Sequence, residues 1–120
     1  MKNYFIILSL AVLTIGISSF KYTDHGFLPT SLKVFVLDEL GNPVQDAEVT
    51  LYAKEADYRA ETNPLAQKIT DKKGIAVFKK LDPVRYFILA SFEERNNVGA
   101  GVQTDSLHEG RVNKVNTIIQ

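Results

Sequence analysis

The side chains best suited to chemistry are few, and they lie far apart in the sequence. The chain contains two histidines and no cysteine. His25 falls in an irregular stretch rich in turn-forming residues, and His108 lies in a turn with Asp105 and Glu109. Neither histidine has a second ligand at the short spacings typical of zinc sites, so we expect both to be exposed loop residues. The lack of cysteine excludes disulfides, thiol catalysis and thiolate metal sites.

Oxygen-bearing side chains cluster in two turns and one acidic pair. The turn at residues 38–42 carries Asp, Glu and Asn, and Asp71 opens a second turn. Calcium takes about six to eight oxygens, usually from a longer loop, so ordinary turn hydrogen bonding explains both. Glu93 and Glu94 are adjacent and would point to opposite sides of a strand end, unlike the paired carboxylates of glycosidases. No serine lies in a Gly-x-Ser-x-Gly setting. We therefore expect no catalytic residue, no metal and no cofactor.

The bulk composition predicts one small globular domain. The chain has 120 residues, 45% of them hydrophobic, with 14 basic and 14 acidic side chains. This length has room for a single hydrophobic core. The balanced charge gives no electrostatic footprint for nucleic acid or an anionic membrane, so we expect neither as a partner.

The first residues have the order of a secretory signal peptide. Lys2 precedes an apolar run at residues 4–17, which ends in small residues. The run is shorter than the about 20 residues of a transmembrane helix, which makes an uncleaved anchor the weaker alternative. The sequence therefore predicts a signal peptide over residues 1–19, a tether over residues 20–31, and no membrane span in the mature chain. Export to the periplasm, the outer surface or the medium follows from this prediction.

The rest of the chain is organised around residues 68–90, where a tight turn lies between alternating segments. Asp71 can bond the backbone ahead of it, and Gly74 can supply a positive φ, so we expect a hairpin closed by these residues. Strand patterns recur about every 8 to 12 residues, which is typical of a sandwich. The predicted strands cover residues 32–37, 48–53, 68–70, 75–79, 86–92, 98–104 and 111–120, with a short helical turn at 55–61. The expected fold is all-β, a seven-stranded antiparallel Greek-key β-sandwich over residues 32–120.

The alternation also divides the strands into inner and outer faces. Side chains such as Val34, Phe78 and Ile88 fall on the predicted core side. The apolar residues on the opposite side form a candidate interaction face, made of Phe35, Leu37, Ile75, Val77, Phe87 and Leu89. Exposed apolar patches mark interaction surfaces more often than catalytic sites. If the register is shifted by one residue, these side chains are core instead.

Two segments carry a family resemblance. They are residues 34–52 (VFVLDELGNPVQDAEVTLY) and residues 70–78 (TDKKGIAVF), the second followed by Leu81 and the strand pattern at 86–90. Together they resemble the carboxypeptidase regulatory-like domain, a transthyretin-like (prealbumin-like) sandwich of exported bacterial proteins, especially of Bacteroidetes. The resemblance covers about residues 32–120. It implies a non-enzymatic binding or structural accessory domain, whose partner is another exported or cell-envelope protein or a glycan.

Relatives within this broad fold suggest two alternative functions. Adhesin spacer modules with internal isopeptide bonds place a lysine and an acid where this chain has Val36 and Ala90. Hydroxyisourate hydrolases resemble the first segment, but their histidines and their C-terminal Tyr-Arg-Gly-Ser are missing here. The alternatives are therefore an adhesin-type spacer, and a transthyretin-like oligomeric hydrolase or small-ligand carrier. The sequence does not determine the oligomeric state.

Overall fold

The computed structural model describes residues 28–120. The predicted signal peptide, most of the predicted tether and His25 lie outside the described residues. Among residues 28–120, no helix is both long enough and apolar enough to cross a membrane.

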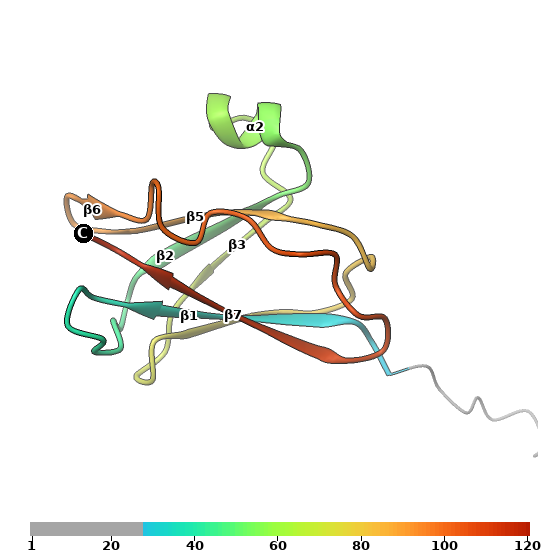
Figure 1. The fold of residues 1–120 in the computed structure, drawn as a ribbon, viewed down its shortest axis with the longest axis horizontal. Coiled ribbons are helices and arrows are strands. Elements are labelled where there is room, and N and C mark those ends of the chain that lie inside the picture. Colours follow the sequence, from blue (N-terminus) through green and yellow to red (C-terminus); the bar gives the residue numbers. More distant parts are fainter. Residues whose placement is uncertain (1–27) are drawn as a thin grey trace, which may run out of the picture.

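The described chain is mostly β and forms two sheets (Figure 1). The three-stranded sheet has the order β4-β1-β7 and consists of β1 (Ser31–Leu37), β4 (Ile75–Phe78) and β7 (Val112–Ile118). The four-stranded sheet has the order β3-β2-β5-β6 and consists of β2 (Glu48–Tyr52), β3 (Ala66–Ile69), β5 (Phe87–Phe92) and β6 (Arg95–Asn96). The helix α2 (Glu55–Ala60) forms where a helical turn was predicted, and it lies beyond the four-stranded sheet in Figure 1.

The hydrophobic core lies between the two sheets and confirms the predicted alternation. Buried side chains come from β1, β4, β2 and β5, and they include Leu32, Val34, Val36, Ala76, Phe78, Val49, Leu51, Ile88 and Ala90. Apolar burial of this kind is the main driving force of folding. The register predicted for β1, β4 and β5 is therefore confirmed. In β2 both faces are buried, because Thr50 and Tyr52 on one face are buried as well as Val49 and Leu51 on the other.

The turn at residues 71–74 forms as predicted, but the hairpin around it does not. Asp71 Oδ1 accepts hydrogen bonds from the backbone N–H groups of Lys73 (2.9 Å) and Ile75 (3.0 Å). The flanking strands β3 and β4 belong to different sheets. β3 pairs with β2, whereas β4 pairs with β1, and the Gly74 carbonyl continues the second pairing by accepting a bond from Val36 N at 2.8 Å. The predicted hairpin is wrong, and the turn instead passes the chain from one sheet to the other.

One strand pair contradicts the prediction of a wholly antiparallel sandwich. β1 and β7 run parallel, with Ser31 beside Val112 and Leu37 beside Ile118. The other strand pairs among residues 28–120 are antiparallel. Alternation reports which side of a strand is buried and says nothing of the direction of its neighbour, so the sequence pattern could not reveal this pair.

Residues 98–104 form a loop where a strand was predicted. The loop contributes an isolated bridge between Gln103 and Phe87, and it contains Gly99 and Gly101 at φ values of 87° and 76°. Such positive φ values lie outside the β region, so the glycines interrupt the strand. Conversely, the short strand β6 forms within a stretch predicted to be a loop.

The turn after β1 gives a pH-dependent prediction. Asp38 Oδ1 accepts hydrogen bonds from the backbone N–H groups of Asn42 and Leu40, each at 2.9 Å. The bond from Asn42 is the main cause that lowers the Asp38 pKa below its ordinary value of 3.8. A lowered pKa contributes stability that is present above the unfolded-state pKa and lost as pH falls through the folded-state pKa. We expect an NMR titration of Asp38 to have its midpoint below 3.8. A midpoint at or above this value would contradict the role of these bonds.

Candidate functional site

The structure divides the six residues of the predicted interaction face between two opposite surfaces. Phe35, Leu37, Ile75 and Val77 belong to the three-stranded sheet, whereas Phe87 and Leu89 belong to the four-stranded sheet. All six are half-buried, and each points away from the core as predicted. The prediction of one continuous patch is nevertheless wrong, because the alternation cannot tell to which sheet a strand belongs.

Phe87 serves as a platform for α2. The Tyr58 ring of α2 lies 6.2 Å from the Phe87 ring and 6.0 Å, edge-on, from the Tyr52 ring. Burial raises the pKa of the Tyr52 and Tyr58 hydroxyls. A small hollow of about 250 Å³ beside the helix is lined by Tyr58, Arg59, Glu61, Leu89 and Val98. The apolar side chains on this sheet are thus partly used for packing within the domain.

The other four residues lie on the exposed side of the three-stranded sheet, which we call the outer face. Phe35 pairs with Ile75, and Lys33 pairs with Val77. β7 extends this surface, because Ile118 lies beside Leu37 and Lys114 lies beside Lys33. The outer face consists of Lys33, Phe35, Leu37, Ile75, Val77, Val112, Lys114, Asn116 and Ile118. The predicted interaction face did not include these β7 residues, although residues 111–120 were predicted to form a strand.

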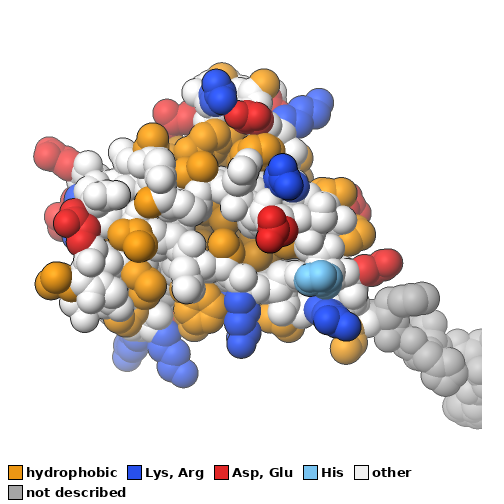
Figure 2. All heavy atoms as spheres, in the orientation of Figure 1, with side chains coloured by type: hydrophobic (Ala, Val, Ile, Leu, Met, Phe, Trp, Pro, Cys, Tyr) orange, Lys and Arg blue, Asp and Glu red, His pale blue; other side chains and the backbone are white. Residues whose placement is uncertain are grey.

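The outer face is both apolar and basic. Val112 is 54% exposed and Ile118 is 40% exposed, which is high for branched aliphatic side chains in strands. The charged residues of its three strands are Lys33 and Lys114, and Lys79 follows β4 directly. Figure 2 shows lysine and arginine side chains between hydrophobic ones along the lower edge of the molecule, where Figure 1 places β1 and, at the lower left, the yellow turn between β3 and β4. This surface therefore suits a partner that offers apolar contact and negative charge.

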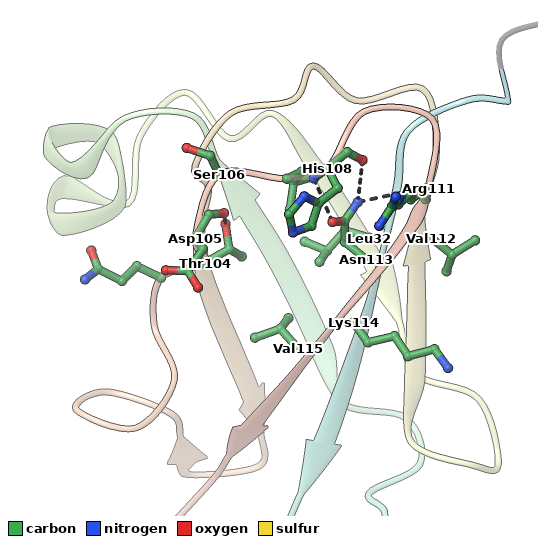
Figure 3. Close-up of a pocket in the computed structure, with 12 residues that line it drawn as sticks. Leu32, Thr104, Asp105, Ser106, His108, Arg111, Val112, Asn113, Lys114 and Val115 are labelled. Atoms are coloured by element: carbon green, nitrogen blue, oxygen red, sulfur yellow. Dashed lines mark hydrogen bonds between the residues drawn. The ribbon is translucent and has the colours of Figure 1, made fainter.

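A groove runs beside the N-terminal half of β7 (Figure 3). Its volume is about 500 Å³, and it lies between β7 and residues 103–108. Leu32 and Val115 form an apolar floor, while Thr104 and Asp105 stand on the opposite wall. No sequence pattern predicted this groove, because it depends on two segments that meet only in the folded chain.

Asn113 builds the end of the groove. Its Oδ1 accepts a hydrogen bond from His108 N at 2.8 Å, and its Nδ2 donates to the carbonyls of Ser31 (3.1 Å), His108 (3.2 Å) and Arg111 (3.2 Å). Gly110 N adds a bond to Thr30 Oγ1 at 2.8 Å. The turn that carries His108 is therefore fixed to the start of β1 by one amide side chain and one hydroxyl.

The groove brings together an acid, a hydroxyl and an imidazole without linking them. Asp105, Ser106 and His108 all line it, and Figure 3 draws no bond between their side chains. An activated nucleophile lies within hydrogen-bond reach of its base, and no such bond joins these three side chains in the described part of the chain. Among residues 28–120, no group of three or more His, Cys, Asp and Glu side chains is placed to hold a metal ion.

A buried amide that the sequence did not single out connects both sheets. Asn97 is fully buried. Its Oδ1 accepts a bond from Ala90 N (2.9 Å), and its Nδ2 donates to Ile88 O (3.0 Å) and Thr117 Oγ1 (2.8 Å). Beyond the end of β6, the Asn97 side chain therefore makes the hydrogen bonds to the β5 backbone that a neighbouring strand would otherwise make. It also reaches Thr117 on β7, in the other sheet.

The positions relevant to an isopeptide bond are apolar and inside the core. Val36 and Ala90 are both fully buried. Lys33 is the lysine of β1, and its position in the register places it on the outer face. The structure thus brings neither an amine nor a carboxyl group to the positions that this chemistry requires.

Comparison with known proteins gives a fold likeness alone. No family model matches the chain, and no curated protein matches it either. Among solved structures, a chain described as the Bacillus anthracis TIE protein matches with a TM-score of 0.55 and 16% sequence identity. The match covers 78% of this chain and 16% of the TIE protein chain. This chain therefore resembles a small part of a much longer protein, at an identity that shows only the fold.

Proposed function

We propose that this protein is an exported, non-enzymatic β-sandwich that acts as a binding or structural accessory domain in the cell envelope. The observation that carries the proposal is the outer face, where exposed Val112 and Ile118 extend the apolar surface of Phe35 and Ile75. Its lysines favour an acidic partner surface. The partner in this proposal is another exported or cell-envelope protein.

The proposal includes a family assignment, the carboxypeptidase regulatory-like domain with a prealbumin-like Greek-key sandwich. Support comes from contact between the two segments that carry the resemblance. A Cβ built on Gly74 would lie 2.8 Å from Val36 O, 3.0 Å from Pro43 Cβ and 3.0 Å from Val44 N. The two segments thus form one packed unit, as a shared structural motif requires.

The experiment that tests this function places a photo-crosslinking amino acid at Ile118 on the outer face. The matched control carries it at Leu65, which is 51% exposed and therefore similarly accessible. In intact cells, we expect a discrete crosslinked protein from Ile118 at a yield at least about fivefold above that from Leu65, because only the outer face is engaged. Lys114→Glu should reduce this yield.

Three other outcomes would contradict or change the proposal. Equal crosslinking from both positions would mean that the outer face is not selective. A crosslink to a second copy of the chain would favour the oligomeric carrier or hydrolase. A crosslinked product that carries glycan in place of protein would support the outer face as the binding surface, but the partner would then be a glycan.

A further inference from the structure

Only alternate residues of β7 form backbone hydrogen bonds with a neighbouring strand. Ser31 N donates to Arg111 O at 3.0 Å, and Ile119 N donates to Leu37 O at 2.9 Å, so the odd-numbered residues face β1. Because hydrogen-bonding groups alternate along a strand, Val112, Lys114, Asn116 and Ile118 turn their N–H and C=O groups away from β1. Among residues 28–120, no other backbone bond engages these groups. With seven residues, β7 is longer than the edge strands β3, β4 and β6.

The C-terminal half of this edge is covered by the chain itself. Gly101 lies against it so closely that a Cβ there would be 2.8 Å from Asn116 O. Farther along, Gln120 and Asn96 exchange two backbone hydrogen bonds of 3.0 and 3.4 Å. Natural proteins commonly protect edge strands in this way. The protection stops at the N-terminal half, where Val112 to Val115 border the groove of about 500 Å³.

We propose that this groove binds an extended peptide segment of a partner protein, which pairs with β7 as an additional strand. The free N–H and C=O groups of Val112 and Lys114 would supply the backbone hydrogen bonds. Peptide binding at a sheet edge obtains its affinity from such bonds and its specificity from alternate side-chain positions. The neighbouring groove provides space for those side chains of the added strand that point toward the core.

The side chains around the groove specify the chemistry of the segment. An inward residue of the segment would rest on Leu32 and Val115, which favours an apolar side chain. Asp105 on the opposite wall disfavours an acidic one there. An outward residue would lie beside Lys114, with Lys33 next to it in the register, which favours glutamate or aspartate. The preferred segment therefore alternates apolar and acidic residues.

Hydrogen exchange measured by NMR tests this site on the protein purified from cells. The probe is a short acetylated peptide in which valine and glutamate alternate. At saturation, we expect the amides of Val112 and Lys114 to exchange at least about tenfold more slowly. The amides of Asn113 and Val115 should not change, because they already face β1. The control is the same peptide with alternate amides methylated, which cannot pair with the edge and should protect nothing.

A variant separates the side-chain preference from the backbone pairing. Lys114 is exposed, so Lys114→Glu should fold normally. This variant should lower the affinity for the valine-glutamate peptide about fivefold. It should instead raise the affinity for a peptide in which valine and lysine alternate. Crosslinking at Ile118 does not depend on the groove, so the outer-face proposal and this one can fail separately.

Two results would overturn the proposal. One is the absence of protection at peptide concentrations up to about 1 mM, which is the weak end of specific binding. The other is protection of Val112 and Lys114 before any peptide is added, which would mean that the edge is already occupied. If that protection depends on protein concentration, the occupant is a second copy. If it does not, the edge is protected within a single copy of the chain.

Discussion

Replacing Asn97 with alanine is expected to lower the free energy of unfolding by about 3 to 4 kcal/mol, because several buried groups would lose their partners together. Ala90 N–H, Ile88 C=O and the Thr117 hydroxyl all bond to this side chain. Each buried polar group left unsatisfied costs about 1 to 3 kcal/mol. Urea denaturation of the variant and the parent protein measures the difference.

Asn96 provides a matched control. It is the same residue type at the neighbouring position, but it is exposed, and its Oδ1 accepts a bond from Val98 N at 3.0 Å. Asn96→Ala should therefore cost less than about 1 kcal/mol, as expected for an exposed hydrogen bond. Asn97→Asp keeps the acceptor, but an ionised carboxylate cannot donate to Ile88 O, so at neutral pH this variant should be about as harmful as alanine. A similar small loss for the variants at both positions would show that Asn97 does not hold the sheets together.

Replacing Gly74 with alanine is expected to destabilise the domain by about 3 kcal/mol, from two separate causes. A residue with a Cβ pays about 1 to 2 kcal/mol for left-handed backbone, and Gly74 has φ of 74°. The added Cβ would also lie 2.8 Å from Val36 O, which is backbone of the central strand β1 and cannot easily move. Thermal and urea denaturation would measure the total effect.

Gly41 separates the two causes of this effect. It has φ of 85°, yet a Cβ there would meet nothing within 4 Å. Gly41→Ala should therefore show only the conformational cost, about 1 to 2 kcal/mol. The difference between the two variants measures how tightly the turn at residues 71–74 is packed on β1. If the two variants lost the same free energy of unfolding, the turn could move away from β1 at no cost. The contact between Gly74 and Val36 would then not help to join the two sheets.

Local sequence patterns predicted the local parts of this fold. Alternation identified Val34, Phe78 and Ile88 as core residues, because a strand with one buried face shows a period of two. The Asp71 turn was also predictable, since its hydrogen bonds lie within a few residues of one another. The pairing of strands was not predictable in the same way. Which strand lies beside β1 depends on contacts between distant segments, and the same alternation fits either partner and either direction.

The candidate sites show the same limit. The outward direction of Phe35 and Phe87 was correct, but their assignment to one surface needed the sheet topology. The groove beside β7 required the segment at residues 103–108 to be placed against Val115. Asn97 lies in a polar stretch, and no local pattern distinguishes it from its exposed neighbour Asn96. A single side chain that takes the place of a strand neighbour has no periodic signal in the sequence.

The position of β1 between β4 and β7 also affects how the domain folds. Ser31 near the start of the described chain pairs with Val112 near its end, so the three-stranded sheet cannot be completed until almost the whole sequence is available. Contacts between distant residues slow folding, since the long intervening chain must be closed first. During synthesis, β1 would therefore remain without β7 until the last part of the sequence has been made. The domain is therefore expected to fold more slowly than one whose first and last strands are not neighbours.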